Sequence, residues 1–259
     1  MRHESLLRVE GLTKRFGGVE AVSGVSFHVG RGEIYSLIGP NGAGKTTTFN
    51  MISGIVPPSA GTVHYDGRDI TGMPSHRMPL RGIGRTFQNL AVFKHASVVE
   101  NLLVGRHCHM RTNVFDAAWF LGRARREELE HRRKVEEIID FLEIEDIRDM
   151  PVGALSYGMQ KRVELGRALA TEPRLLLLDE MVSGMNTEET EDIARFVLDI
   201  RDELGVTVLM VEHDMGIVMD ISDRVCVLNF GRKIAEGTPA QVSADPAVIE
   251  AYLGGAKAA

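Results

Sequence analysis

A phosphate-binding pattern near the start of the chain most constrains what this sequence can fold into. Residues Gly39 to Thr46 read G-P-N-G-A-G-K-T, which fits G-x-x-x-x-G-K-[ST], and they directly follow the apolar run Ile34 to Ile38. The pattern carries its chemistry only as a loop between a strand and a helix. We therefore expect a strand at 34–38, a P-loop that binds nucleoside triphosphate, and a helix over about 45–53.

Each position of this loop has a predicted role. Main-chain N–H groups and the N-terminus of the following helix bind phosphate oxygens. Lys45 is expected to reach the β- and γ-phosphates, and the Thr46 hydroxyl to bind Mg²⁺. A GTPase is disfavoured because no N-K-x-D segment is present, so the predicted cofactors are ATP and Mg²⁺. The loop residues expected to line the nucleotide are Gly39, Pro40, Asn41, Gly42, Ala43, Gly44, Lys45, Thr46 and Thr47.

Two further apolar runs end in residues suited to catalysis. The run 175–178 is leucine throughout, as expected of a strand buried on both faces of a parallel sheet, and it ends in Asp179 and Glu180. At the carboxyl end of such a strand, Asp179 would hold Mg²⁺ and Glu180 would polarise the attacking water. The run 206–211 is followed by Glu212 and then His213, which places this histidine at the same edge, near the γ-phosphate. The alternatives are a surface Asp-Glu turn and a structural histidine.

A segment between these runs points to a family. Residues 155–160 read L-S-Y-G-M-Q, occupy the place of the L-S-G-G-Q signature, and lead into a predicted helix from Lys161 to Ala170. With this segment, the P-loop, the Asp-Glu pair and the histidine, the chain resembles the nucleotide-binding subunit of an ABC transporter over about residues 7–253. The resemblance implies an ATPase in which two cassettes close head to tail over two ATP molecules.

The resemblance also implies roles for residues outside the P-loop. Ser156 and the main chain of Gly158 would bind the γ-phosphate of ATP held by the partner cassette. Gln88 matches a glutamine that contacts Mg²⁺ or its water, and Phe16 matches the aromatic residue that stacks on adenine. The predicted catalytic residues are thus Glu180, His213, Gln88 and Lys45, and the predicted metal ligands are Thr46, Gln88 and Asp179.

Four positions depart from the family pattern. Tyr157 and Met159 lie inside the signature, Met181 replaces the proline that normally follows the catalytic glutamate, and Asn186 stands where aspartate is common. Met159 removes an amide that usually lies near the ribose. We expect these changes to act on the hydrolysis rate or on communication between subunits.

The resemblance also implies an α/β fold: a P-loop NTPase core with a mostly parallel sheet, an antiparallel β subdomain and an inserted α-helical subdomain. The chain of 259 residues fits a single such domain. We assign residues 1–88 and 166–259 to the core with its β subdomain, and residues 89–165 to the helical subdomain with the signature segment.

A dense mixed-charge run, Arg123 to Lys134, lies in the predicted helical subdomain. Its pairs Glu128/Arg132 and Glu130/Lys134 are spaced i,i+4, which predicts ion pairs on one helix face. A solvated face is the first interpretation, and a docking surface for a regulator is the second.

Composition excludes several other functions. Apolar residues make up 44% and charged residues 25%, as in ordinary globular proteins. Apolar runs fall short of the roughly 20 residues that a membrane span needs, and the first residues, M-R-H-E, lack the apolar stretch of a signal peptide, so we expect a cytoplasmic chain. Cys108 and Cys226 show no metal-site spacing and are expected to be reduced. The net charge of −6 disfavours a nucleic-acid partner.

Other segments bear on the kind of transporter. Residues 85–89, 212–215 and 237–239 are similar to those of the ATP-binding subunits of branched-chain amino acid importers, which implies uptake of such amino acids or of a related small polar or organic-acid solute. Residues 46–51 and 54–57 are instead similar to those of the ATPase of the lipopolysaccharide exporter, which is the alternative. A soluble, non-transport ABC ATPase is a third reading, disfavoured because the chain has one cassette and lacks long coiled-coil insertions.

The importer resemblance implies a set of partners. These are two membrane-spanning permease subunits, a second ATPase subunit arranged head to tail in a homo- or heterodimer, and an extracytoplasmic substrate-binding protein. The chain would then lie on the cytoplasmic side of the inner membrane, bound through the permeases. The ATPase does not touch the cargo in this arrangement, so its residues do not identify the cargo.

Overall fold

The computed structural model describes residues 5–87, 90–110 and 123–254. The chain divides into two compact units, one formed by residues 1–78 with 175–259 and the other by residues 79–174. Each is described by itself. The assignment of residues 89–165 to a helical subdomain stays a prediction.

A mostly parallel sheet forms the centre of the first unit. Within the first unit, the strands of this sheet lie in the order β10-β9-β3-β8-β7. Strand β3 pairs in parallel with both β8 and β9, β7 pairs in parallel with β8, and β10 is antiparallel to β9. Every residue of β3, β7 and β8 is buried, which explains why these strands read as unbroken apolar runs. The bounds are β3 (Ile34–Ile38), β7 (Leu175–Asp179), β8 (Thr207–Val211), β9 (Arg224–Asn229) and β10 (Arg232–Gly237).

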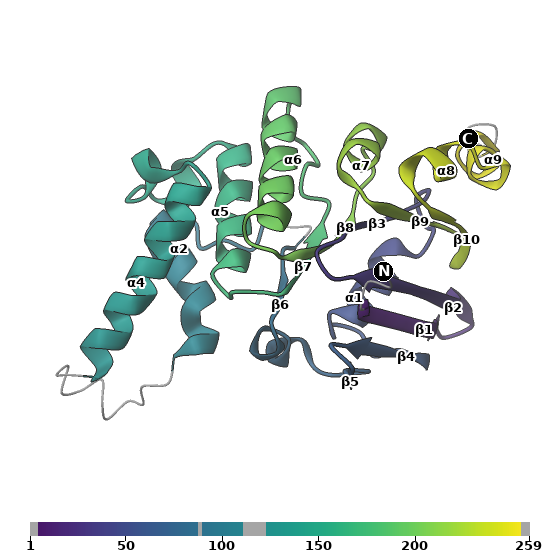
Figure 1. The fold of residues 1–259 in the computed structure, drawn as a ribbon, viewed down its shortest axis with the longest axis horizontal. Coiled ribbons are helices and arrows are strands. Elements are labelled where there is room, and N and C mark those ends of the chain that lie inside the picture. Colours follow the sequence, from purple (N-terminus) through teal and green to yellow (C-terminus); the bar gives the residue numbers. More distant parts are fainter. Residues whose placement is uncertain (1–4, 88–89, 111–122, 255–259) are drawn as a thin grey trace. The chain divides into compact units, whose positions relative to one another are not determined.

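Helices cover both faces of this sheet. Helix α1 (Lys45–Ile52) lies on one face, and α6 (Thr187–Asp202) and α7 (Met215–Ile221) lie on the other (Figure 1). The short helices α8 (Pro239–Ser243) and α9 (Pro246–Gly254) follow β10. Asn186 is the N-cap of α6: its side chain accepts from the N–H of Glu189 at 2.9 Å. Asparagine and aspartate cap helices about equally well, so this departure from the family pattern preserves the helix start.

A second, antiparallel sheet completes the first unit. Its order is β2-β1-β4-β5, with β1 (Ser5–Phe16), β2 (Val19–Gly30), β4 (Ala60–Tyr65) and β5 (Arg68–Asp69). Helix α1 lies between the two sheets (Figure 1). The aromatic rings of Phe27 in β2 and Tyr35 in β3 stack with centroids 5.2 Å apart, so the two sheets share one apolar core.

The second unit is largely helical. Helices α2, α4 and α5 pack against one another, and a Cβ at Gly166 of α5 would lie 3.0 Å from Leu142 and 3.3 Å from Leu102, so these helices approach closely there. The elements are 3-10 turns at Pro79–Arg81, Arg106–His109, Glu145–Ile147 and Val152–Ala154, β6 (Ile83–Arg85), α2 (Val98–Gly105), α4 (Arg123–Phe141) and α5 (Tyr157–Leu169). Another 3-10 turn, Ser75–Arg77, belongs to the first unit.

The structure supports the predicted fold class and corrects some details. The parallel sheet, the antiparallel sheet and the helical unit are all present. Helix α5 begins at Tyr157, earlier than the predicted Lys161, because Ser156 caps it. On α4, Arg132 pairs with Glu128 at 2.9 Å as predicted, but Lys134 pairs with Glu137 at 2.8 Å instead of Glu130. Within the part of the chain that the structure describes, the helices lack the combined length and apolarity of a membrane span.

Candidate nucleotide site

The strand ends of the first unit bring the predicted site together. Val211 at the end of β8 is the register partner of Asp179 on one side and of Leu37 on the other. The three strands are parallel, so the segments that follow them leave the same edge of the sheet. These segments are the P-loop after β3, Glu180 after β7, and Glu212 with His213 after β8.

The P-loop has the tight backbone that its glycines allow. Gly44 is the N-cap of α1 with φ +95°, and a Cβ there would lie 2.7 Å from the carbonyl oxygen of Ala21. A Cβ at Gly39 would lie 2.1 Å from the carbonyl oxygen of Leu228. Both positions exclude any larger residue, so the loop is fixed against β2 and β9 with the helix N-terminus behind it. This is the setting in which main-chain N–H groups bind phosphate.

Lys45 is positioned at the base of this loop. Its ammonium donates to the carbonyl oxygens of Gly39 at 2.6 Å and Pro40 at 3.1 Å. Burial lowers the pKa of this ammonium, and the Glu180 carboxylate acts in the opposite direction. Lys45 and Glu180, predicted from separate motifs, are therefore electrostatic neighbours.

Glu180 leaves β7 in an unusual conformation. Asp179 is 1% exposed, whereas Glu180 is half-buried and has φ +49°. The Glu180 N–H donates to the carbonyl oxygen of Val211 at 2.9 Å. A left-handed glutamate is uncommon and costs free energy, and such residues gather at functional sites.

His213, Phe16 and the two threonines also lie in this unit. His213 is exposed and is the second residue after β8, and Thr46 and Thr47 are half-buried in the first turn of α1. Phe16 ends β1 with its side chain 51% exposed and the Lys14 ammonium 5.1 Å from its ring centroid. An exposed ring is available for stacking on a base, as the prediction requires.

Glu212 is a further acidic residue at this edge of the sheet, and it is not among the site residues predicted from the sequence. It is 2% exposed, and its Oε1 accepts the N–H of Val182 at 3.3 Å. The available signal was the one used for Asp179, an acidic residue directly after a buried parallel strand.

Burial raises the pKa of the Glu212 carboxyl to about 7, the N–H groups of Val182, Met181 and His213 act against this, and the Glu180 charge adds to it. Between about pH 4.5 and 7 the folded chain therefore holds a proton that the unfolded chain has released. The free energy of unfolding falls as pH rises through this window, by about 3 kcal/mol.

We expect Glu212→Gln to remove this pH dependence, because glutamine does not titrate. The stability of the variant relative to wild type should rise between about pH 5 and about pH 8, by up to about 3 kcal/mol. Urea unfolding of both chains at several pH values measures the difference. An offset between the two chains that does not change with pH would contradict a raised pKa.

The signature residues lie in the second unit. The Ser156 side chain is the N-cap of α5 and accepts the N–H of Met159 at 3.3 Å, and Gly158 is buried in the first turn. Gln88 lies outside the described residues. Its neighbours Phe87 and Ala91 donate main-chain N–H groups to Oε1 of the buried Glu164, at 3.2 and 3.4 Å.

The donors of the first unit fit a magnesium ion shared with phosphate. Asp179 offers a buried carboxylate and Thr46 a hydroxyl, both oxygen donors of the kind that Mg²⁺ takes. Among the described residues there is no cluster of three or more histidine, cysteine, aspartate or glutamate side chains that would bind a metal by itself. Such a site suits Mg²⁺, which is held by one or two protein groups together with nucleotide phosphates.

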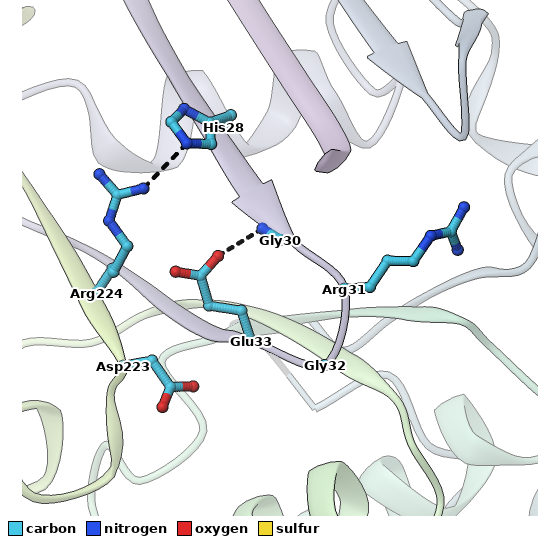
Figure 2. Close-up of a pocket in the computed structure, with 7 residues that line it drawn as sticks. All are labelled: His28, Gly30, Arg31, Gly32, Glu33, Asp223 and Arg224. Carbon is cyan, nitrogen blue, oxygen red and sulfur yellow. Dashed lines mark hydrogen bonds between the residues drawn. The ribbon is translucent and has the colours of Figure 1, made fainter. Parts of the chain in front are cut away.

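A separate cavity of about 630 Å³ lies at the opposite edge of the parallel sheet (Figure 2). Gly30 to Glu33, which precede β3, and Asp223 with Arg224, at the start of β9, line it. The Arg224 guanidinium is bonded to Glu236 at 2.7 Å and to His28 at 3.2 Å, and Glu33 accepts the N–H of Gly30. These groups already bind one another, and the cavity is separate from the P-loop.

The arrangement of P-loop, Asp179, Glu180 and His213 defines a nucleoside-triphosphatase of the P-loop class. The ABC transporter family profile matches residues 22–183, and that of the branched-chain amino acid ATP-binding cassette transporters matches residues 232–258. The chain belongs to the ABC transporter family, as an ATP-binding cassette with ATPase activity.

Curated relatives match over almost the whole chain. The high-affinity branched-chain amino acid transport ATP-binding protein BraF of Pseudomonas aeruginosa is 43% identical, with 96% of this chain and 98% of BraF covered. LivG of Escherichia coli, of the same description, is 39% identical, with 97% and 98% covered. The lipopolysaccharide export ATP-binding protein LptB of Haemophilus influenzae is 38% identical, with 96% and 98% covered.

Solved structures agree with the fold. A nucleotide-free ATP-binding cassette from an ABC transporter is 35% identical with a TM-score of 0.84, covering 96% of this chain and 99% of that one. The ADP conformation of the cassette MJ1267 is 34% identical with the same TM-score of 0.84, covering 97% and 99%. The predicted P-loop NTPase fold and the predicted ABC family are therefore confirmed.

Proposed function

We propose that this chain is the ATPase subunit of an importer of branched-chain amino acids. The observation that carries the proposal is the 43% identity to BraF over nearly the full length of both chains. The match of residues 232–258 to the branched-chain cassette profile adds support from a part of the chain outside the ATPase motifs. The same ATP hydrolysis could drive uptake of another small polar or organic-acid solute, because the ATPase does not contact its cargo.

The site residues divide the work of ATP hydrolysis. Phe16 stacks on the adenine, and Lys45 with the P-loop main chain binds the phosphates. Glu180 orients water and takes its proton, while His213 contacts the γ-phosphate. Thr46, Asp179 and Gln88 would hold Mg²⁺, which when bound would stabilise the negative charge on the transferred phosphoryl group and on the leaving ADP.

The signature completes the site from a second cassette. Ser156 and Gly158 lie at the N-terminus of α5, where the helix dipole and main-chain N–H groups favour a phosphate. A post-hydrolysis cassette with ADP and phosphate that is 25% identical to this chain is dimeric, which supports a dimer here. Closure of such a dimer would move two permeases, and the chain would lie on the cytoplasmic side of the membrane beside them. An external binding protein would deliver the cargo.

We expect Met159→Gln to preserve or raise ATP hydrolysis in the assembled transporter. The Met159 N–H that bonds to Ser156 belongs to the main chain and survives the change, and glutamine restores a polar side chain near the ribose. Steady-state ATPase activity of the purified complex measures this. A loss greater than about tenfold, or 1.4 kcal/mol in the barrier, would mean that methionine is required at this position.

Affinity purification of the tagged chain from gently solubilised native membranes tests the proposed assembly. We expect mass spectrometry to find two permeases and an ATPase partner. Recovery of lipopolysaccharide-export subunits would favour the alternative that the 38% identity to LptB supports. Recovery of the chain without membrane proteins would contradict a transport role.

A further inference from the structure

The turn after β7 holds Glu180 in a conformation that needs support. At φ +49° its side chain crowds the main chain, a cost that glycine or asparagine would reduce. Strained residues of this kind persist only where their surroundings fix them. The contacts that fix this turn therefore also fix the direction in which the Glu180 carboxylate points.

Glu212 provides those contacts from the neighbouring strand. Its Oε1 accepts the N–H of Val182 at 3.3 Å, and the N–H groups of Met181 and His213 also favour its charged form. Met181 is 1% exposed, so water does not reach this part of the turn to replace a lost acceptor. The turn is thus held on one side by the Val211 carbonyl, which binds the Glu180 N–H, and on the other by the Glu212 carboxylate.

An ordinary structural carboxylate in this unit looks different. Glu236, 12% exposed, pairs with Arg224 and Lys233, each at 2.7 Å, and accepts the Tyr35 hydroxyl at 2.9 Å. Within the described residues Glu212 forms no ion pair, and its Oε2 is buried without a hydrogen-bond partner. Its charged neighbour is another acid, Glu180. Burying an acid without a cation costs free energy. We therefore expect Glu212 to have a function in the turn that it contacts.

We propose that Glu212 is a positioning residue for ATP hydrolysis, which holds the Glu180–Val182 turn so that the Glu180 carboxylate faces the attacking water. The proposal rests on the proposed role of Glu180 as the catalytic base. Glu212 acts through the main chain and does not touch the nucleotide.

Two variants at this position separate the acceptor from the side-chain volume. Glu212→Gln keeps an oxygen that can accept the Val182 N–H. Glu212→Leu keeps a similar side-chain volume but is apolar and has no acceptor. In the purified transporter complex we expect Leu to lower kcat at least tenfold with the KM for ATP within about threefold, and Gln to stay within about threefold of wild-type kcat. Glu236→Gln is the control: it makes the same chemical change at a largely buried carboxyl group of the same unit, and it should leave kcat unchanged.

A double variant tests whether Glu212 acts through Glu180. If it does, Glu212→Leu should cause little further loss in a Glu180→Gln chain, because the group it positions is already gone. A full additional tenfold loss would overturn the proposal, as would equal kcat values for the Leu and Gln variants at position 212. If Glu212→Leu does not fold, Glu212→Met takes its place, and failure of both to fold would mean that Glu212 serves folding instead. If Glu180→Gln alone keeps wild-type turnover, Glu180 is not the catalytic base, and the role proposed for Glu212 is contradicted with it.

Discussion

Replacing Glu180 with glutamine is expected to leave ATP binding intact and to lower ATP hydrolysis by about a hundredfold or more, the usual contribution of a general base. Glutamine has nearly the same shape, so the strained turn and its bonds to Val211 and Glu212 should survive. The amide cannot take a proton from water, which removes the chemical step alone. With hydrolysis blocked, the ATP-bound dimer should accumulate.

Two measurements check this expectation, one on the purified complex and one on the isolated chain. Phosphate release gives the hydrolysis rate, and size-exclusion chromatography of the isolated chain with ATP reports the dimer. Glu188→Gln is a matched control, since Glu188 is an exposed carboxylate in the first turn of α6. Turnover near the wild-type rate in the Glu180 variant would contradict the assignment of the base.

Replacing Lys45 with methionine is expected to weaken ATP binding at least about tenfold, since hydrogen bonds to charged groups contribute about 1.5–3 kcal/mol. The ammonium lies against the carbonyls of Gly39 and Pro40, at the base of the loop that would bind the phosphates. Methionine keeps the length of the side chain and loses its charge, so the main-chain shape of the loop is retained.

Titration of the full chain with a fluorescent ATP analogue measures this loss, and thermal unfolding verifies that the variant is folded. Lys94→Met, an exposed lysine of the second unit, is the control and should bind ATP as wild type does. Wild-type affinity in the Lys45 variant would mean that the loop does not bind the phosphates as proposed.

The sequence predicts β3, β7 and β8 well because these three strands are buried on both faces. Such strands contain little but apolar residues, so β3 was predicted with the bounds it has, and β7 and β8 to within one residue. The catalytic edge follows from the same logic, since parallel strands place their carboxyl ends together. The positions of the P-loop, of Asp179 at the end of β7 and of Glu180 after it could therefore be predicted from the sequence.

Features that depend on contacts between distant segments could not be predicted. The bond between Glu212 and Val182 joins residues 30 apart in the chain, and nothing in the local sequence of either indicates it. The left-handed conformation of Glu180 could not be predicted either, because glutamate rarely adopts a positive φ. The start of α5 was predicted late because the serine of the signature was assigned only to a phosphate, although it also caps the helix.

We propose that ATP hydrolysis at this site drives uptake of branched-chain amino acids. The most direct test is the initial rate of radiolabelled leucine uptake, at low external concentration, by cells lacking this chain and supplied with either the wild-type or the Glu180→Gln chain. We predict that the wild-type chain restores uptake and that the variant, expressed to the same level, does not. Equal uptake with and without the chain, or full uptake with the variant, would contradict the claim.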